Sequence, residues 1–464
     1  MIKRLLVLTV VMIALSFGSV FAAQIDGLAT LTGPALPAGL NVFINPSHLG
    51  DALVYPYYNV RDNKVTYFNI VNTDTANGVI VKLRFREAAT IETTSATTGC
   101  ATAVANFYGA AGTMIDCGSN EVLDFNVCLS AGDVYTGAIV TDTATGAGKF
   151  LELDSDTLTD PSVPASGVVF RFGAANPVKN ITADNTREGY IEVLAFGMHS
   201  DALSTCNTTT GVDAPNRLGG MAFINDEDTA ATYAYAATAI ANCRSTVFAP
   251  SLANDTFVLD NCQNAAGVDD ATLASAHVDQ VDYPLTKVNI GGVYALDPVV
   301  SKGRTAMVIT FPTKKLNDVL HDGRLFSNPT VIFEVWDDKE NTITPTGDFS
   351  PQVVTTNTLP HEVNVLNIKN PAMFTSDVSG TIDTTTFNYG WLAIDLAGGA
   401  SVATVGDGIS DTYYGATTVN TLGLPGIGLV FQDAATEAIS WSLPMAYATA
   451  VSLTGGAGSY TVSP

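Results

Sequence analysis

Hydrophobic and polar residues alternate along much of this chain, most clearly at residues 79–86. Residues 79, 81, 83 and 85 are Val, Val, Leu and Phe, whereas residues 82, 84 and 86 are Lys, Arg and Arg. This alternation predicts a strand with one buried face and one solvent face. Because residues 65–71 form a similar run and Asn77-Gly78 is a good turn dipeptide, we expect 65–87 to be an antiparallel hairpin.

Further runs of this kind predict strands at 123–129, 190–194, 307–311, 331–336, 363–366, 391–396 and 429–431. Stretches rich in Thr, Asp, Gly, Asn and Pro separate the strands, as at 141–148 and 154–166. Many short strands between such loops are typical of an all-β protein. We therefore expect one or more antiparallel β-sandwich domains with long loops.

One stretch departs from the strand pattern. Residues 228–242 are rich in Ala and contain few β-branched residues, which predicts a short helix. Since the strand pattern is weakest at 200–285, we interpret that region as a small, partly helical insertion pinned by disulfides. The expected organisation is a signal peptide at 1–22, an N-terminal β-domain at 23–200, the insertion at 201–285 and a C-terminal β-domain at 286–464.

The N-terminus has the features of a secretory signal peptide. Lys3 and Arg4 precede an uncharged apolar run at 5–20, and residues 20–22 supply the small side chains that a signal peptidase needs. The alternative is a membrane anchor, but the run is shorter than the ~20 residues of a spanning helix, and no later segment is long and apolar enough to be one. We expect a secreted protein at the cell surface or outside the cell, with the periplasm as the other possibility.

Composition narrows the class of protein. A net charge of −24 excludes a nucleic-acid binder that works through a basic surface. Only 14% of the residues are charged and 47% are hydrophobic, which favours a protein that covers much of its surface with copies of itself. Divalent cations, with calcium as the expected one, would bridge or screen the repulsion between such acidic chains.

An even number of cysteines in an oxidising compartment predicts disulfides. Cys100 and Cys117 bracket a Gly/Ala-rich loop and are the first choice for a local bridge. Among the three cysteines of the predicted insertion, two are expected to pair. The connectivity is otherwise open, and the full set of candidates is Cys100, Cys117, Cys128, Cys206, Cys243 and Cys262.

No catalytic motif is present, so we do not expect an enzyme. His361-Glu362 begins like a zinc-protease motif, but residue 365 is Val instead of the second His. Calcium takes several oxygen ligands from flexible loops. The weak calcium candidates are therefore residues of acidic loops, for which the alternative is a solvated loop: Asp154, Asp156, Asp160, Asp226 and Asp228.

Tyr55, Tyr57 and Tyr58 form a dense aromatic cluster. Such a cluster would serve as a sugar-binding platform, for example for cell-envelope glycan. At the start of a strand it would instead pack a sheet edge or a subunit interface.

Several blocks of the chain, taken in order, resemble a family of exported, surface-layer-like proteins of Gram-negative bacteria, often called cell surface proteins. The blocks are Val54–Tyr58, Val81–Glu87, Ser119–Asn126, Gly189–Val193, Thr310–Lys314 and Leu424–Gly428. The resemblance runs from about residue 50 to residue 432, and departs in the cysteine-bearing stretch 200–265 and at a short C-terminus. It implies a secreted, β-rich structural protein and gives no catalytic residues to carry over.

The leading hypothesis is therefore a self-assembling structural protein of the cell exterior, either a surface-layer subunit or an extracellular filament subunit. Its partner would be a second copy of the chain, with contacts from edge strands or loops. The alternative is a secreted adhesin or carbohydrate-binding module, which depends on the cluster at 55–58.

Overall fold

A computed structural model gives the fold of the chain. The residues that it describes are 43–88, 119, 121–154, 158–160, 163–173, 181–199, 206, 216–241, 243, 285–287, 289–295, 303–312, 331–337, 342–343, 359, 361–368, 372–382, 389–396, 424–434 and 437–448. Within this part of the chain the structure is nearly all β, and almost every strand pair is antiparallel, which confirms the predicted fold class. These residues include no helix long and apolar enough to cross a bilayer.

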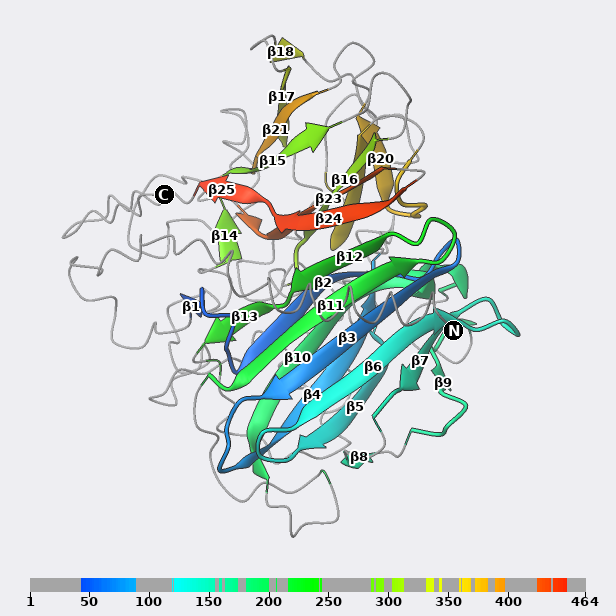
Figure 1. Cartoon of the computed structure of the whole chain (residues 1–464), viewed down its shortest axis with the longest axis vertical. Coiled ribbons are helices and arrows are strands. Elements are labelled where there is room, and N and C mark those ends of the chain that lie inside the picture. The colour runs from blue at the N-terminus through cyan, green and yellow to red at the C-terminus, as the bar shows by residue number, and fades with distance from the viewer. Residues whose placement is uncertain are drawn as a thin grey trace, which may run out of the picture.

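Two sheets form the first sandwich (Figure 1). Sheet I has the order β1 (Phe43–Ile44), β13 (Thr238–Ala241), β2 (Ala52–Asn59), β10 (Glu188–His199), β4 (Gly78–Glu87), β5 (Glu121–Leu129) and β8 (Leu158–Asp160). Sheet II has the order β12 (Thr232–Ala236), β11 (Leu218–Asp226), β3 (Lys64–Asn72), β6 (Val134–Thr141), β7 (Gly148–Glu152) and β9 (Val168–Val169). A short 3-10 helix, η2 (Asp184–Arg187), leads into β10.

Phenylalanines fill the space between sheets I and II. Phe85 of sheet I contacts Phe68 and Phe150 of sheet II, with ring centroids 5.9 and 5.4 Å apart. Phe125 and Phe170 extend the same cluster. These rings are almost fully buried, and burial of such large apolar areas is the dominant favourable contribution to folding.

The predicted hairpin at 65–87 is wrong, although both of its strands exist. β3 pairs with β11 and β6 in sheet II, whereas β4 pairs with β10 and β5 in sheet I. The connection therefore crosses from one sheet to the other. The Asn72 side-chain amide holds this crossing, because it donates to the carbonyl of Asn77 at 2.9 Å and to that of Ser130 at 2.8 Å.

The predicted helix at 228–242 is also wrong, because this stretch forms β12 and β13. Tyr233 and Tyr235 are buried, and the residues between and beside them are half-buried, which is the alternation of a strand. β12 pairs with β11, and β13 pairs with β1 and β2. Packing of the two tyrosines outweighs the modest helix propensity of the alanines. The first sandwich thus continues past residue 200, and these strands are part of its two sheets.

The second sandwich also has two described sheets. Sheet III has the order β18 (Thr342–Ile343), β17 (Ile332–Asp337), β21 (Tyr389–Asp395), β15 (Asn289–Ala295) and β25 (Ala446–Ala448). Sheet IV has the order β20 (Ser379–Ile382), β19 (Val363–Ile368), β16 (Gly303–Thr310), β23 (Ile427–Ala434) and β24 (Glu437–Pro444). A small ribbon pairs β14 (Thr286–Lys287) with β22 (Leu424–Pro425).

The second sandwich has its own core and also shares a core with the first. Met307, Ile309 and Val430 of sheet IV pack with Leu392 and Ile394 of sheet III. The other side of sheet IV, with Val308, Val365 and Phe431 among its residues, belongs to the same buried cluster as sheet I. The two sandwiches therefore lie end to end with a continuous apolar core between them (Figure 1).

Candidate functional site

Aromatic, polar and charged side chains meet at the junction between the two sandwiches. Phe374 and Phe431 of the second sandwich pack against Tyr57 and Tyr233 of the first, with centroid separations between 5.5 and 6.2 Å. Most of these rings meet edge to face, which is a favourable geometry for aromatic pairs. Thr310 adds a polar link, because its hydroxyl donates to the carbonyl of Pro56 at 2.5 Å.

A buried arginine lies beside this aromatic cluster. Arg61, in the turn between β2 and β3, places Nη1 2.5 Å from Asp184 Oδ2 and Nη2 2.7 Å from Asp377 Oδ2. Its Nε lies 3.5 Å from Glu188 Oε1. Since Asp377 belongs to the second sandwich, one guanidinium links three carboxylates across the junction. We call Arg61, Asp184, Glu188 and Asp377 the Arg61 cluster.

Backbone and amide groups orient the Arg61 cluster. The Asn59 side chain accepts the backbone N–H of Arg61 at 2.8 Å and donates to the carbonyl of Thr375 at 3.2 Å. The backbone N–H of Asp377 donates to Glu188 Oε1 at 2.7 Å. Each charged group is therefore held by a neighbour that is fixed by its own strand or turn, as a buried ion pair requires.

Burial and neighbouring charges set the protonation of this cluster. Burial raises the pKa of Glu188 to about 7, although Arg61 opposes the shift. Burial acts to lower the pKa of Arg61, but Glu188 and the two aspartates outweigh burial, so the pKa of Arg61 is raised above its ordinary value. Burial acts to raise the pKa of Asp184, but the hydrogen bond and charge of Arg61 hold it below the usual range. The pKa of Asp377 is raised, mainly by burial.

A second polar contact crosses the junction at Glu362, which is fully buried. The Tyr190 hydroxyl donates to Glu362 Oε2 at 2.7 Å, and the backbone N–H of Ser119 donates to Oε1 at 3.0 Å. The Ser119 hydroxyl also donates to this carboxylate. The backbone N–H of Val363 donates to the carbonyl of Ala88 at 3.2 Å. The start of β19 is thereby fixed to sheet I.

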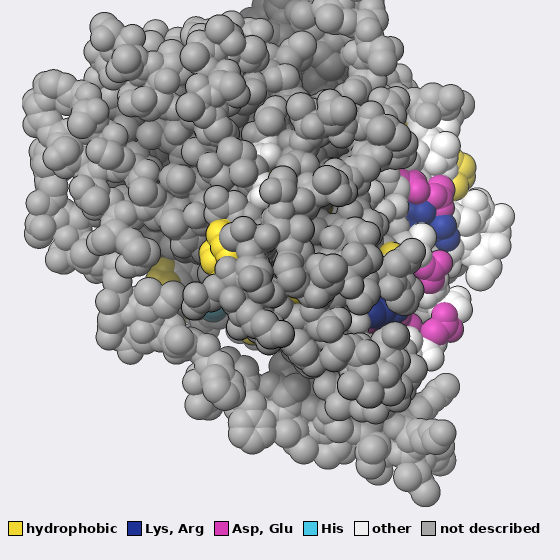
Figure 2. Space-filling model, turned by 90° about the horizontal axis from the view of Figure 1, so that it is seen from above, with side chains coloured by type: hydrophobic (Ala, Val, Ile, Leu, Met, Phe, Trp, Pro, Cys, Tyr) yellow, Lys and Arg dark blue, Asp and Glu magenta, His cyan; other side chains and the backbone are white. Residues whose placement is uncertain are grey.

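The predicted solvent face of β4 is wrong, because Lys82, Arg84 and Arg86 are each 2% exposed or less. Each of them lies next to a carboxylate on an adjacent strand. Lys82 pairs with Asp124, Arg84 Nε lies 3.4 Å from Glu121, and Arg86 Nε lies 3.2 Å from Glu192; these carboxylates lie on β5 and β10. Seen from above, described basic side chains likewise lie among acidic ones and do not form a separate patch (Figure 2).

Serine side chains join the edge of sheet II to the edge of sheet IV. The Ser440 hydroxyl of β24 accepts the backbone N–H of Thr232 at 2.8 Å and donates to its carbonyl at 2.6 Å. Ser442 donates to the carbonyl of Ala234. These hydroxyls take the place of a neighbouring strand for three backbone groups of β12, the N–H and carbonyl of Thr232 and the carbonyl of Ala234.

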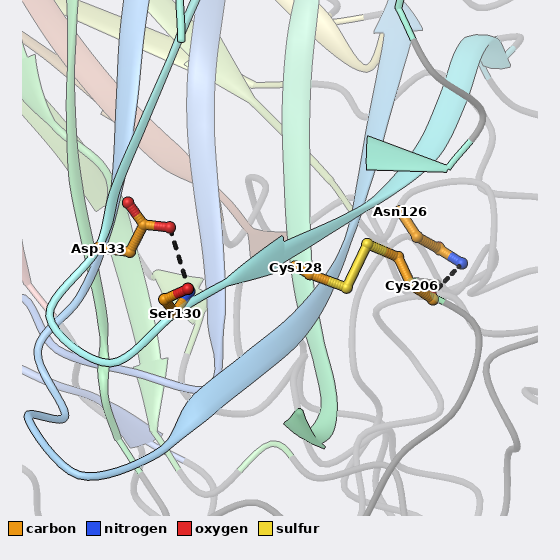
Figure 3. Close-up of a disulfide and its surroundings, with 5 residues drawn as sticks. All are labelled: Asn126, Cys128, Ser130, Asp133 and Cys206. Atoms are coloured by element: carbon orange, nitrogen blue, oxygen red, sulfur yellow. Dashed lines mark hydrogen bonds between the residues drawn. A yellow bond between two sulfur atoms is a disulfide. The ribbon is translucent and has the colours of Figure 1, made fainter. Parts of the chain in front are cut away.

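One disulfide lies wholly within the described residues and links Cys128 of β5 to Cys206 (Figure 3). Asn126 donates to the carbonyl of Cys206 at 3.4 Å beside it. Cys243 is disulfide-bonded too. Cys206 therefore pairs with a cysteine of the central sheet and not within the predicted insertion. The expectation that two of the three insertion cysteines pair with each other is left with Cys243 and Cys262 and stays a prediction. Cys100, Cys117 and Cys262 lie outside the described residues.

The calcium candidates fall into two groups. Asp226 is buried, lies 3.4 Å from Lys64 Nζ, and accepts the backbone N–H groups of Asp228 and Thr229. Asp228 accepts the side-chain amide of Asn63 at 3.0 Å. These two carboxylates thus serve a turn and an ion pair, and no cluster of three or more possible metal ligands occurs among the described residues.

The second group of calcium candidates lies near β8. Asp160 is the last residue of that strand and pairs with Asn126. Asp154 follows β7, and Asp156 lies outside the described residues. The structure does not bring this group together with Asp226 and Asp228, and the calcium prediction stays a prediction.

The tyrosine cluster is not a surface platform, since Tyr55, Tyr57 and Tyr58 are fully buried. Tyr55 packs against Phe68 inside the first sandwich, and Tyr58 packs against Phe170. Tyr57 faces the other way, into the junction. Tyr57 therefore lies at an interface, which is one of the expected alternatives to a sugar platform. This interface joins two parts of one chain and not two subunits.

Sequence reasoning missed the Arg61 cluster. Its members come from three distant segments and match no motif. The one local signal is a charged turn, residues 61–64, between two runs of apolar residues. Comparisons with protein-family models, with curated proteins and with solved structures found no match for this chain.

Proposed function

We propose that this protein is a self-assembling structural protein of the cell exterior, a subunit of a surface layer or of an extracellular filament. The observation that carries the proposal is the junction. An apolar core, the Arg61 cluster, the Glu362 contacts and the serine hydroxyls of β24 join the two sandwiches over several independent contacts.

Such a junction supports a structural role for a physical reason. A periodic assembly repeats the same contact many times, so a small hinge motion within each subunit would accumulate over many copies. Small interfaces between domains permit relative motion, whereas large apolar ones resist it. The buried arginine and carboxylates add directional contacts that hold one orientation. The charge balance and the predicted signal peptide support the same class of function.

Burial of the tyrosines at 55–58 removes the observation that favoured an adhesin or a carbohydrate-binding module, and we propose no second function. Cryo-electron tomography of native cells, together with a strain that lacks the gene, tests the proposal. We expect a regular layer or filaments at the cell surface that disappear in the deletion strain and return on complementation. An unchanged cell surface in the deletion strain would contradict it.

A further inference from the structure

On four adjacent strands of sheet II, β12, β11, β3 and β6, no charged side chain points away from the sandwich core. On the next strand, β7, Lys149 lies opposite Val140 and pairs with Asp142. Burial alternates along β3, β11 and β12, so every second residue points away from the sandwich core. The outward residues are all described and are Val65, Tyr67, Asn69, Val71, Val134, Thr136, Ala138, Val140, Gly219, Met221, Phe223, Asn225, Thr232, Ala234 and Ala236. None of them is Asp, Glu, Lys or Arg.

The strand register gives this face an apolar centre. Tyr67 lies opposite Phe223 on one side and opposite Ala138 on the other, and Phe223 lies opposite Ala234. Tyr67 is 38% exposed and Val134 is 44% exposed. Four strands about 4.8 Å apart and about 25 Å long span roughly 500 Å² of sheet, which is within the range of the largest patches on typical monomers, and such patches are often functional.

Two polar side chains of this face accept hydrogen bonds from within the sheet. The Asn69 side chain accepts the backbone N–H of Met221 at 3.1 Å. The Thr232 hydroxyl donates to Asn225 Oδ1 at 2.9 Å. Covering the face leaves these two hydrogen bonds intact.

The net charge of the chain indicates which partner would cover this face. The chain has a net charge of −24, so two copies repel one another over most of their surface. A face without charge is where they can meet with no like-charge pair in the contact. It also offers no ion-pair partner to a basic or an acidic ligand. We propose that the outer face of β12, β11, β3 and β6 is the contact surface for a second copy of this chain.

Two copies are more readily joined through sheet faces than through strand pairing, because the edges of the first sandwich offer few free strand positions. The described edge strands β1, β8 and β9 have only two or three residues. At the fourth edge, β12, Ser440 and Ser442 bind the N–H and carbonyl of Thr232 and the carbonyl of Ala234. Two copies would therefore stack sheet on sheet about a two-fold axis, with the two Tyr67 side chains near the centre.

This inference rests on the proposed function and is tested by charge substitution in the full mature protein. Tyr67→Lys places like charges opposite one another across the two-fold axis. Val293→Lys is the matched control, because Val293 is 65% exposed on sheet III and the charge change is the same. Sedimentation velocity at matched concentration and ionic strength measures association. We expect the control to associate like the wild type and Tyr67→Lys to associate at least tenfold more weakly.

Charge reversal separates a direct contact from a loss of folding. A mixture of Tyr67→Lys and Tyr67→Glu, each of which self-associates poorly, should recover association, because opposite charges then meet across the axis. Association of Tyr67→Lys at the wild-type level, or no recovery in the mixture, overturns the inference and leaves the proposed function in place. A wild type that stays monomeric at every concentration overturns both.

Discussion

Arg61 and Asp377 lie 316 residues apart in the chain, yet Nη2 of the arginine donates to the aspartate Oδ2 at 2.7 Å. The same guanidinium is bound to Asp184 of the first sandwich. The ion pair thus ties the turn after β2 to the loop before β20, next to the shared apolar core. We regard it as the centre of the junction, and the first two predictions concern it.

Removal of Arg61 should destabilise the protein strongly. Arg61→Met keeps much of the side-chain volume but leaves buried Glu188 without its cation, which typically costs about 3 kcal/mol or more. Arg61→Lys keeps the charge but loses the fork that reaches two aspartates, so it should fall between Met and the wild type. Denaturant unfolding measures both. Equal stability of Arg61→Met and the wild type would show that the cluster does not hold the junction.

Stability should fall as the pH rises from about 4.5 to about 7, because of Glu188. Its pKa is about 7 when folded and near 4.5 when unfolded, so the folded state binds more protons within this range. Glu188→Gln removes this titration. The stability of the variant relative to the wild type should therefore increase with pH across the range, by at most about 3 kcal/mol. Thermal unfolding at pH 5 and pH 8 measures the difference.

Asp184 supplies the opposite pH dependence at more acid values. The pKa of Asp184 is lowered in the folded protein. Its contribution to the free energy of unfolding is therefore present at pH values above 3.8, the ordinary pKa, and is lost as the pH falls below that value. As far as these two groups are concerned, the wild type should be most stable near pH 4, above the range in which Asp184 is protonated and below the range in which Glu188 ionises. If the free energy of unfolding rose steadily from pH 5 to pH 8 in the wild type and in Glu188→Gln alike, Glu188 would not be the group responsible.

Loss of the Cys128–Cys206 disulfide should lower stability through the unfolded state. The bridge closes a loop with a sequence separation of 78, for which loop entropy predicts a loss of about 4 kcal/mol. The double variant Cys128→Ala/Cys206→Ala, unfolded by denaturant without reductant, isolates this bridge from the others. The single variant Cys128→Ala serves as a control for mispairing, which non-reducing mass spectrometry detects. A double variant with unchanged stability would exclude a stabilising role.

The serine hydroxyls of β24 should protect the edge of β12. Ser440→Ala removes the acceptor of the Thr232 N–H, so this amide should exchange with solvent faster than in the wild type. Amides of β3, deeper in sheet II, should be unchanged and serve as the internal control. Hydrogen exchange followed by NMR or mass spectrometry measures both. Unchanged protection at Thr232 would show that other contacts hold this edge.

The sequence predicted the strands better than their partners. The alternation at 79–86 correctly located β4, but its charged side is buried because Glu192 lies on β10, more than a hundred positions along the chain. Local pattern does not reveal such a partner. The helix prediction at 228–242 is wrong for the same reason. Tyr233 is buried because it packs against Phe374 and Phe431 of the other sandwich, which are distant in the sequence.

Self-association is the central claim, and sedimentation velocity of the purified mature protein over a range of concentrations, with and without calcium, tests it most directly. We predict that the sedimentation coefficient increases with concentration, that large species form, and that negative-stain electron microscopy of the same samples shows regular sheets or filaments. A single monomeric species at all concentrations, in both the presence and the absence of calcium, would contradict the account.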